Sequence, residues 1–374
     1  MRFNIEGVPA QAGRGRIGGV VALLLLVSLV FTACGDNTAT TAPAATTAPA
    51  ATTAAMTTSA AQTTAAGTTG AAQTTGTATT TGATGSISVV DASGTTITLP
   101  APAKRVVCIG PPCIELLADL EIVPVASTFM NLVVKKEYFG DLSKQVTEIG
   151  GTTAAPDLEQ IARAKPDLII GEAGFNDDLR TSLSKTAPYF LAKRAGLTEP
   201  YDNLRLVGKL TGKADKAEEV IKKFDARLAA YKARSPKDKT FVFMSNYVLN
   251  GQVATNPSAI CLFVGQVTKG CVLQPPANVN PRGMVNMSLE KILEANPDAL
   301  IVGVNPSTAG ADADKAKNEL LANAFWKELP AVKSGQVYEV DTQVWVRTQL
   351  RSLSIMLDDA MTRMYPDIFP TPLS

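Results

Sequence analysis

Apolar and polar residues follow two periods along this chain, one typical of strands and one typical of helices. In residues 87–99, ISVVDASGTTITL, they alternate on both sides of a Ser-Gly turn, which predicts a β-hairpin. Apolar runs predict strands at 105–109, 122–126, 240–244 and 336–340, and helices are predicted at 113–120, 178–185, 204–210, 313–326 and 348–365. Because strands alternate with helices, the pattern predicts an α/β fold with largely parallel sheets.

The longest predicted helix covers residues 213–234 and shows a clear amphipathic pattern. Its apolar side chains recur every three or four positions, at Ala217, Val220, Ile221, Phe224, Leu228 and Tyr231. Lys and Glu cover the opposite face, and Ser235-Pro236 ends the helix. The segment is either a connector between two lobes or a surface helix of the first lobe.

One motif occurs twice. Residues 157–170 read DLEQIARAKPDLII and residues 288–301 read SLEKILEANPDALI, with seven identities at an offset of 131 residues (158 to 289). Each copy predicts a short helix that stops at Pro-Asp and is followed by a buried strand. A repeat at this spacing indicates two similar lobes rather than a solenoid. The predicted fold is therefore α/β, with two Rossmann-like lobes, parallel-rich sheets, one long connecting helix and a ligand cleft between the lobes.

The N-terminal segment has the features of a targeting signal. Arg14 and Arg16 precede an apolar run, and the sequence Val30-Phe31-Thr32-Ala33-Cys34 that follows resembles a bacterial lipoprotein signal, with Cys34 as the lipid carrier. An ordinary signal peptide or a spanning helix are the alternatives, although the run is short for a membrane span. Lipid chains on Cys34 would hold the protein at a membrane.

Composition changes sharply after Cys34. Residues 37–85 consist almost entirely of Thr, Ala, Gly, Gln and Pro, and such a segment cannot bury enough apolar surface to offset its ordering entropy. We expect a disordered tether. The predicted organisation is a signal peptide (1–33), the lipidated Cys with its tether (34–85), a first lobe (86–212), a connecting helix (213–235) and a second lobe (236–374).

Charge and residue types exclude several classes of function. A formal net charge of +1 and no basic stripe argue against nucleic-acid binding. The sequence contains no His, which excludes Ser-His-Asp and Cys-His catalysis. It also lacks the His ligands of most zinc sites, and the absence of His argues against a haem-binding site. No GxxxxGK[ST], GxSxG or CxxC motif is present. We therefore expect no enzyme, no cofactor and no directly bound metal.

Four cysteines remain after Cys34. An even number in an exported protein favours disulfides. Proximity in the sequence favours Cys261 with Cys271 and, more weakly, Cys108 with Cys113. Four cysteines allow three pairings, so the connectivity stays open at this point, and buried free thiols are the alternative.

Several segments taken together resemble a known family. They are KRVVCIGPPCIELLADLEIVPVA (104–126), both LExI…PDxxI copies, the connecting helix, and the closing helix that ends in Arg363-Met364-Tyr365-Pro366. In this order they resemble the bacterial substrate-binding proteins for ferric siderophores and cobalamin, over residues 87–367. The resemblance implies two α/β lobes joined by a rigid helix, a ligand in the cleft between them, small closure, and delivery of the ligand to a membrane ABC importer.

The resemblance also implies roles for the repeated carboxylates. Glu159 and Glu290 occupy the same position of the two motif copies, near the start of a helix, where a carboxylate is favourable in any case. In the family, one Glu on each lobe docks into Arg pockets of the importer. Matched carboxylates suit a two-fold symmetric permease dimer, because each lobe meets one subunit.

Six residues are candidate ligand contacts: Phe129, Glu172, Tyr247, Trp345, Arg347 and Arg351. Arg347 matches a ligand-reaching position of the family, Arg351 lies one turn further along, and an Arg fork suits an anionic chelate. Trp345 is either an apolar wall against the ligand or a core residue. The other three match strand ends that face the cleft, and Glu172 replaces an aromatic residue there. Backbone N–H groups in loop 110–113 are a further candidate contact.

We therefore expect a monomeric, lipid-anchored solute-binding protein on the extracytoplasmic face of the cell membrane, which captures a ferric siderophore-type chelate for an ABC importer. Cobalamin, and then haem, are the alternatives within the same family. A surface interaction lipoprotein without a role in transport is an alternative from a different class.

Overall fold

The computed structural model describes residues 85–194, 196–277, 279, 283–305 and 310–373. The predicted signal peptide, Cys34 and all of the predicted tether except Gly85 lie outside these residues. In the part of the chain that is described, no helix is both long enough and apolar enough to cross a bilayer.

The first half of the described chain forms a five-stranded parallel sheet in the order β5-β4-β3-β6-β7. Its strands are β3 (Val106–Cys108), β4 (Ala126–Ser127), β5 (Thr147–Glu148), β6 (Leu168–Glu172) and β7 (Tyr189–Ala192), and the hairpin β1 (Ile87–Val90) and β2 (Thr96–Leu99) precedes them. Its helices are α1 (Pro111–Asp119), α2 (Met130–Val133), η1 (Gly140–Gln145), α3 (Leu158–Arg163), η2 (Asp177–Leu179), α4 (Arg180–Leu183) and α5 (Glu199–Leu210). Strands β3 and β7 are buried throughout, as expected of a parallel sheet covered on both faces.

The second half forms a mixed sheet in the order β11-β9-β8-β12-β13, with β10 paired to β8. Its strands are β8 (Thr240–Met244), β9 (Gln252–Ala254), β10 (Gly270–Cys271), β11 (Met284–Asn286), β12 (Ala299–Val304) and β13 (Val337–Asp341). Its helices are α7 (Ala259–Val264), α8 (Leu289–Ala295), α9 (Ala311–Ala322), α10 (Ala324–Glu328), α11 (Pro330–Lys333), α12 (Thr342–Trp345) and α13 (Leu350–Met364). The strand pairs β8–β10, β8–β12 and β12–β13 are parallel, whereas the pairs β8–β9 and β9–β11 are antiparallel. The predicted α/β class is confirmed.

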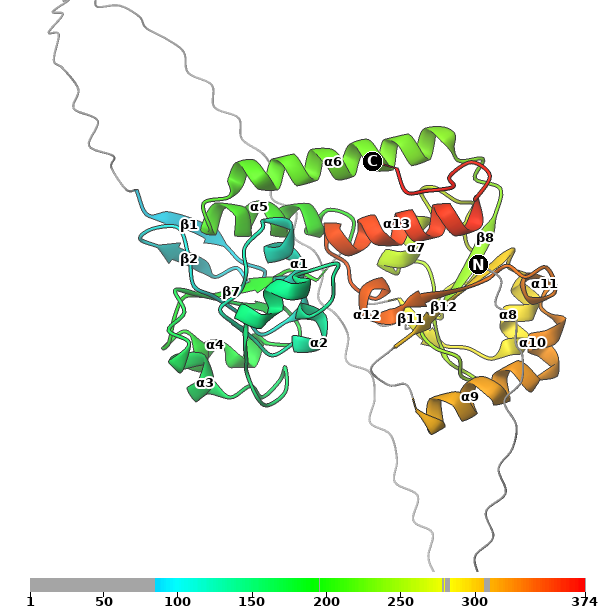
Figure 1. Ribbon diagram of the computed structural model, residues 1–374, viewed down its shortest axis with the longest axis horizontal. Helices are drawn as coiled ribbons and strands as arrows, with labels where there is room; N and C mark the ends of the chain where they lie inside the picture. The colour runs from blue at the N-terminus through cyan, green and yellow to red at the C-terminus, as the bar shows by residue number, and fades with distance from the viewer. Residues whose placement is uncertain (1–84, 195, 278, 280–282, 306–309, 374) are drawn as a thin grey trace, which may run out of the picture. The chain divides into compact units, whose positions relative to one another are not determined.

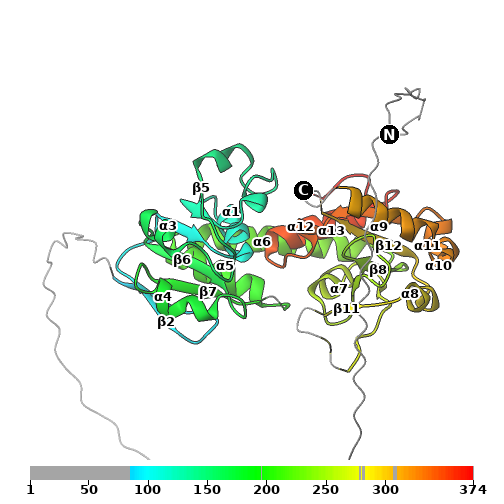
Figure 2. The same ribbon diagram turned by 90° about the horizontal axis from the view of Figure 1, so that it is seen from below.

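Helix α6 (Ala214–Arg234) joins the two halves, as predicted. It has 21 residues, which is about 32 Å of helix. In Figure 1, α5 and α13 lie along successive parts of α6, and both contact it. In Figure 2, α12 and α13 lie between the strands of the two sheets. Helix α13 packs on α1 of the first half as well as on α7 of the second, so the closing helix contacts both halves.

The two motif copies fold alike and hold their sheets in the same way. In each copy the helix ends at a residue with positive φ, Lys165 (46°) or Asn296 (50°), and the next residue is Pro. The Asp after that Pro caps the first strand of its own sheet. Asp167 accepts the backbone N–H of Lys104 and Arg105, both at 2.8 Å. Asp298 accepts the N–H and the hydroxyl of Thr240, at 2.7 and 2.6 Å.

Asp298→Ala is expected to lower the free energy of unfolding by about 1–2 kcal/mol, because it leaves the Thr240 N–H at the start of β8 without its partner. Asp298→Asn keeps an acceptor and should cost less. The Thr240 hydrogen bonds lower the pKa of Asp298, so this contribution is complete above the ordinary value of 3.8 and is lost as pH falls through the depressed value. Denaturant titration of both variants at neutral pH measures the difference, and equal stability of Ala and wild type would contradict it.

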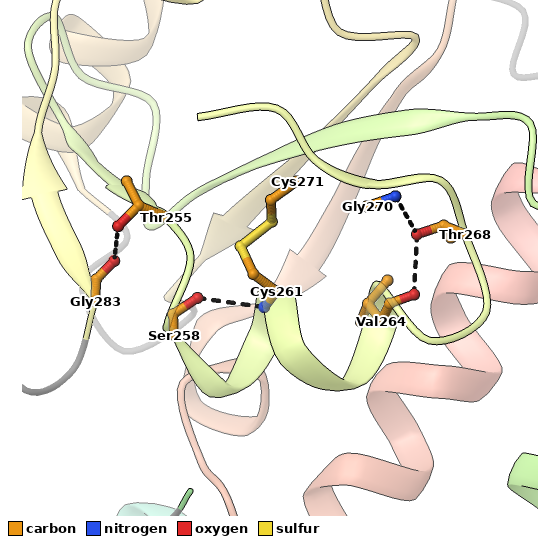
Figure 3. The surroundings of a disulfide bond; sticks show 8 residues. All are labelled: Thr255, Ser258, Cys261, Val264, Thr268, Gly270, Cys271 and Gly283. Atoms are coloured by element: carbon orange, nitrogen blue, oxygen red, sulfur yellow. Dashed lines mark hydrogen bonds between the residues drawn. A yellow bond between two sulfur atoms is a disulfide. The ribbon is translucent and has the colours of Figure 1, made fainter. Parts of the chain in front are cut away.

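Two disulfides link neighbouring segments of the chain. Cys108, at the end of β3, is bonded to Cys113 in α1. Cys261 in α7 is bonded to Cys271 in β10, and Figure 3 shows this bridge tying the helix to the edge of the second sheet. Both pairs join cysteines close in sequence, and both bring a helix to the strand against which it packs.

Candidate functional site

A pocket of about 470 Å³ lies where strands of both sheets end. From the first sheet come Pro111 after β3, Phe129 after β4, Glu172 at the end of β6 and Arg194 after β7, and from the second come Ser245 after β8 and Thr342 after β13. The carboxyl ends of parallel strands are the usual binding position in open α/β sheets. The pocket is therefore a ligand site shared by both halves of the chain, and its volume suits a small molecule.

A glutamate and an arginine from neighbouring strands form an ion pair in the pocket wall. An Nη2 atom of Arg194 lies 3.2 Å from Oε1 of Glu172, and both side chains are largely buried. The Arg194 guanidinium also lies over the ring of Phe175, 4.2 Å from its centroid, which is a cation–π geometry. The wall thus presents a guanidinium that is fixed by a carboxylate on one side and an aromatic ring on another.

Arg347 supplies a second guanidinium from the opposite half of the chain. It lies between α12 and α13, where its Nε donates to the backbone carbonyl of Gln343 at 3.1 Å. Its Cζ is 6.0 Å from the centroid of the Phe129 ring, across the pocket in the first half. Two arginines from two lobes therefore line the same cavity, which favours a ligand with negative charge or several oxygen acceptors.

Neutral polar side chains complete the described lining. Ser258 caps α7 by accepting the N–H of Cys261 at 3.2 Å, and Figure 3 shows this cap beside the disulfide. The Thr342 hydroxyl donates to the carbonyl of Ser245 at 3.1 Å, so two strand ends of the second sheet are linked at the pocket. Hydroxyl and amide groups at such positions can hydrogen-bond an oxygen-rich ligand.

Behind Arg347 lies a buried polar network that joins the two halves. Glu115 of α1 accepts the backbone N–H of Gln349 at 2.9 Å and the hydroxyl of Ser352 at 2.5 Å, at the start of α13. The hydroxyls of Tyr138 and Ser352 lie 2.9 Å apart. Burial raises the pKa of Glu115 from its ordinary value of 4.5 to about 7, although Ser352, Arg347 and the Gln349 N–H all favour the charged form. The N-cap residue of α13, Gln349, makes no side-chain cap hydrogen bond, and Glu115 of α1 supplies the acceptor at this helix start instead.

Of the six predicted ligand contacts, the pocket brings together Phe129, Glu172 and Arg347. The prediction that Trp345 contacts the ligand is corrected, because this side chain is fully buried and stacked on Phe243 with ring centroids 5.7 Å apart. Its indole N–H donates to Asp359 at 2.9 Å. Trp345 therefore packs in the core rather than in the pocket wall, which is the second of the two roles that the sequence analysis allowed for it.

Arg351 and Tyr247 also lie away from this pocket. The Arg351 guanidinium bonds the carbonyls of Glu137 and Ala118 at 2.9 and 2.8 Å and lies 3.0 Å from the carboxylate of Asp119. It fastens α13 to α1.

The Tyr247 ring packs edge-on against Trp326, with centroids 6.0 Å apart, and beneath the ammonium group of Lys317.

The prediction that backbone N–H groups of loop 110–113 contact the ligand is also corrected. Pro111 and Pro112 have no N–H, and the N–H of Cys113 donates to the carbonyl of Gly110.

Arg194, Phe175 and Ser258 are pocket residues that the sequence analysis missed. Arg194 lies two residues after the buried run YFLA, so a strand prediction at 189–192 would have placed it near a strand end. Ser258 precedes a short helix whose apolar run was not recognised. In the described ranges, no cluster of His, Cys, Asp or Glu could hold a metal ion directly.

The repeated carboxylates lie at the surface, apart from the pocket. Glu159 is the second residue of α3 and pairs with Arg163 at 3.4 Å, with both side chains mostly exposed. Glu290 is the second residue of α8 and is exposed. Asp157 and Ser288 cap the two helices by accepting the N–H of Gln160 and Lys291, so both carboxylates stand in the same local frame.

Comparisons with known proteins agree with this architecture. The chain is similar to the probable siderophore-binding lipoprotein YfiY of Bacillus subtilis (29% identity over 74% of this chain and 86% of the relative). It is equally similar to the Fe(3+)-citrate-binding protein YfmC of the same organism (29% identity; 74% and 85%).

Among solved structures, the fold resembles FeuA of B. subtilis complexed with ferri-bacillibactin (TM-score 0.62, 21% identity, 75% of this chain and 98% of that one). It also resembles Staphylococcus aureus SirA complexed with staphyloferrin B (TM-score 0.59, 24% identity; 74% and 98%). The model of the periplasmic binding protein family matches residues 106–344, which is more than half of the chain. This chain belongs to the periplasmic binding protein family.

Proposed function

We propose that this protein is the extracytoplasmic substrate-binding component of an ABC importer and that it captures a ferric siderophore-type chelate. The observation that carries the proposal is the pocket in which Arg194 from the first half and Arg347 from the second face one cavity at the strand ends. Guanidinium forks, hydroxyls and the rings of Phe129 and Phe175 suit an anionic, oxygen-rich chelate with a partly apolar surface. The names of YfiY and YfmC support this ligand class over cobalamin or haem.

Capture should involve only modest closure of the two halves. Buried apolar side chains of both halves form one continuous cluster, which includes residues of α1, α6, α7 and α13. Opening such a core widely would expose apolar surface, so a stiff connection is favoured over a wide hinge. We propose that the chain performs no chemistry on its ligand, in keeping with a family of substrate-binding proteins.

Docking to the permease is proposed to use Glu159 and Glu290. The two exposed carboxylates occupy equivalent helix starts in two repeated units, which suits a partner with two-fold symmetry. We further propose that Cys34 carries the lipid anchor, so that the monomer stays at the outer face of the cell membrane beside its importer. The description of YfiY as a lipoprotein supports that anchor.

Calorimetry of residues 86–374 with ferric citrate, a ferric trihydroxamate, a ferric tricatecholate, cobalamin and haem tests the proposal directly. Arg347→Ala is expected to weaken binding of the preferred ferric chelate by roughly 10- to 100-fold, because it removes charge-assisted hydrogen bonds from the pocket. Arg205→Ala, an exposed arginine of α5, is the control and should bind as wild type does. Tight binding of cobalamin or haem alone would overturn the ligand class, and unaltered binding by Arg347→Ala would show that the ligand lies elsewhere.

A further inference from the structure

A buried asparagine lies between the two chain segments that carry the pocket arginines. Asn203, in the first half of α5, is fully buried and bonds the backbone of Lys193, the residue before Arg194. It also bonds the side chain of Gln349, which lies two residues after Arg347 and is almost fully buried. The two arginines line one pocket from opposite halves of the chain. Asn203 is therefore hydrogen-bonded close to both of them in sequence.

The Asn203 amide makes these contacts through its oxygen and its nitrogen. Oδ1 accepts the N–H of Lys193 at 2.9 Å, and Nδ2 donates to the Lys193 carbonyl at 2.9 Å and to Oε1 of Gln349 at 3.2 Å. A side-chain amide offers two donor hydrogens and an acceptor oxygen, whereas a carboxylate of the same size has no donor and an alkyl chain has neither. The three bonds together therefore require an asparagine at this position.

Lys193 lies just beyond the end of a strand pair. The ladder between β6 and β7 ends at the pair of Glu172 and Ala192, one residue earlier. The two bonds from Asn203 to the Lys193 backbone take the place of those that a neighbouring strand would make, so they fix the direction in which the chain leaves β7. Since Arg194 is the next residue, Asn203 sets the backbone position from which this guanidinium reaches the pocket.

The start of α13 is also held by the first half of the chain. The Gln349 backbone N–H donates to Glu115 of α1 at 2.9 Å, and its side-chain oxygen accepts from Asn203 of α5. The two residues before Gln349, Arg347 and Thr348, line the pocket. In Figure 1, α5 and α13 lie one after the other along α6, and the bond between Asn203 and Gln349 joins their starts. Almost no solvent reaches this bond, which strengthens it.

We propose, building on the proposed function, that Asn203 is a positioning residue of the ligand site and fixes the separation between Arg194 and Arg347. It holds the first arginine through Lys193 and the second through Gln349. An oxygen-rich ligand that bonds both guanidinium groups binds most tightly when their separation already matches its own, because binding then orders little. Loss of Asn203 should therefore weaken binding, although this side chain is buried outside the pocket lining.

Calorimetry on the full-length protein tests this role. The probe is whichever of ferric citrate, a ferric trihydroxamate and a ferric tricatecholate binds wild type most tightly. Asn203→Ala removes all three bonds, whereas Gln349→Leu removes only the bond between the halves and keeps a side chain of similar size. Thr211→Val is the matched control, because the buried Thr211 hydroxyl donates to the carbonyl of Val207 at 2.8 Å at the opposite end of α5. Thermal unfolding of each variant shows whether it is folded.

We expect Asn203→Ala to weaken binding about tenfold and Gln349→Leu about threefold to tenfold, while Thr211→Val binds as wild type does. A double-mutant cycle with Arg347→Ala separates positioning from support of the fold. Without Arg347 there is no separation between two arginines to preserve, so Asn203→Ala should then weaken binding by at most about threefold and Gln349→Leu hardly at all. A residue that only supports the fold would weaken binding by the same factor with and without Arg347.

Wild-type affinity in Asn203→Ala, or equal factors in the two backgrounds, would overturn the positioning role and leave the proposed function intact. If wild type binds only cobalamin or haem, the proposed ligand class fails, and the same cycle with that ligand decides whether Asn203 positions the arginines. If wild type binds none of the five ligands, the proposed function fails and this inference fails with it.

Discussion

Replacing Glu159 and Glu290 together by alanine is expected to reduce uptake of the bound chelate in cells to background, while the purified protein binds the chelate as wild type does. The two carboxylates are exposed and lie apart from the pocket, so their loss should not reach the ligand. Each would meet an arginine of one permease subunit, and truncating one partner of a desolvated charge pair costs about 2–5 kcal/mol. Two such losses in one interface amount to several orders of magnitude in affinity.

Single variants separate docking from a general charge effect. Glu159→Ala and Glu290→Ala should each reduce uptake partially. Glu294→Ala provides the control on the same helix as Glu290, because Glu294 is exposed and pairs only with the neighbouring Lys291 at 2.7 Å among the described contacts. Normal uptake by the double variant would exclude these carboxylates as docking residues, and weakened chelate binding would show that they act on the binding protein itself.

The repeat was the strongest predictor of the fold, because it carries both local and long-range information. The Pro of each copy stops its helix, the Asp caps the first strand of the sheet, and the following apolar run forms a central strand. The long helix was equally predictable. Five of the six residues in its predicted stripe are buried, and Val220 is partly buried, since a period near 3.6 over twenty residues has few alternatives.

Boundaries that depend on single side chains could not be predicted. The predicted helix at 313–326 is two helices, α9 and α10, because Asn323 leaves the helical conformation and caps α10 through the N–H of Phe325. The predicted strand at 122–126 pairs only at its end, where β4 begins at Ala126. The position of α13 against α1 depends on the buried Glu115 network, which has no signature in local sequence.

Pocket residues could be predicted where the sequence pattern shows the end of a buried strand. Glu172 ends β6 and Phe129 lies two residues after β4, and both line the pocket, whereas Arg194 was missed because the strand before it was not predicted. Arg351 was placed with Arg347 by helical spacing. However, Arg347 precedes α13, which begins at Leu350, so the two arginines do not share a helix face. The prediction for Trp345 was wrong because closeness in sequence to a pocket residue does not distinguish a side chain in the pocket wall from one in the core.

At pH 4.5, Glu115→Ala is expected to lower the free energy of unfolding by about 3 kcal/mol or more. The change leaves the N–H of Gln349 and the hydroxyl of Ser352 without their carboxylate acceptor in a site with almost no solvent, and it opens a cavity between α1 and α13. Urea titration measures the loss. The same change at Glu121, an exposed residue after the end of α1, is the control and should be nearly neutral, since its ion pair with Lys216 is at the surface. A Glu115→Ala protein of wild-type stability would show that this network does not hold α13 against α1.

Glu115→Gln distinguishes the hydrogen bonds of this network from its charge. Burial raises the pKa of Glu115 to about 7, so between the ordinary value of 4.5 and about 7 the folded state binds a proton that the unfolded state has released. The contribution of Glu115 to stability is therefore complete below about pH 4.5 and falls as pH rises to 7, by about 3 kcal/mol in total. The glutamine side chain stays neutral, and the Ser352 hydroxyl can rotate so that its oxygen accepts a hydrogen bond from the glutamine amide N–H. We thus expect Glu115→Gln to be close to wild type at pH 4.5 and to gain stability relative to wild type, by up to that amount, at pH 8. Urea titrations of both proteins at pH 4.5 and pH 8 measure how the difference between their free energies of unfolding changes with pH.

A difference between the two proteins that is constant with pH would contradict this expectation. It would mean that Glu115 is charged in the folded state throughout, because Arg347 and the start of α13 stabilise the carboxylate more than burial destabilises it.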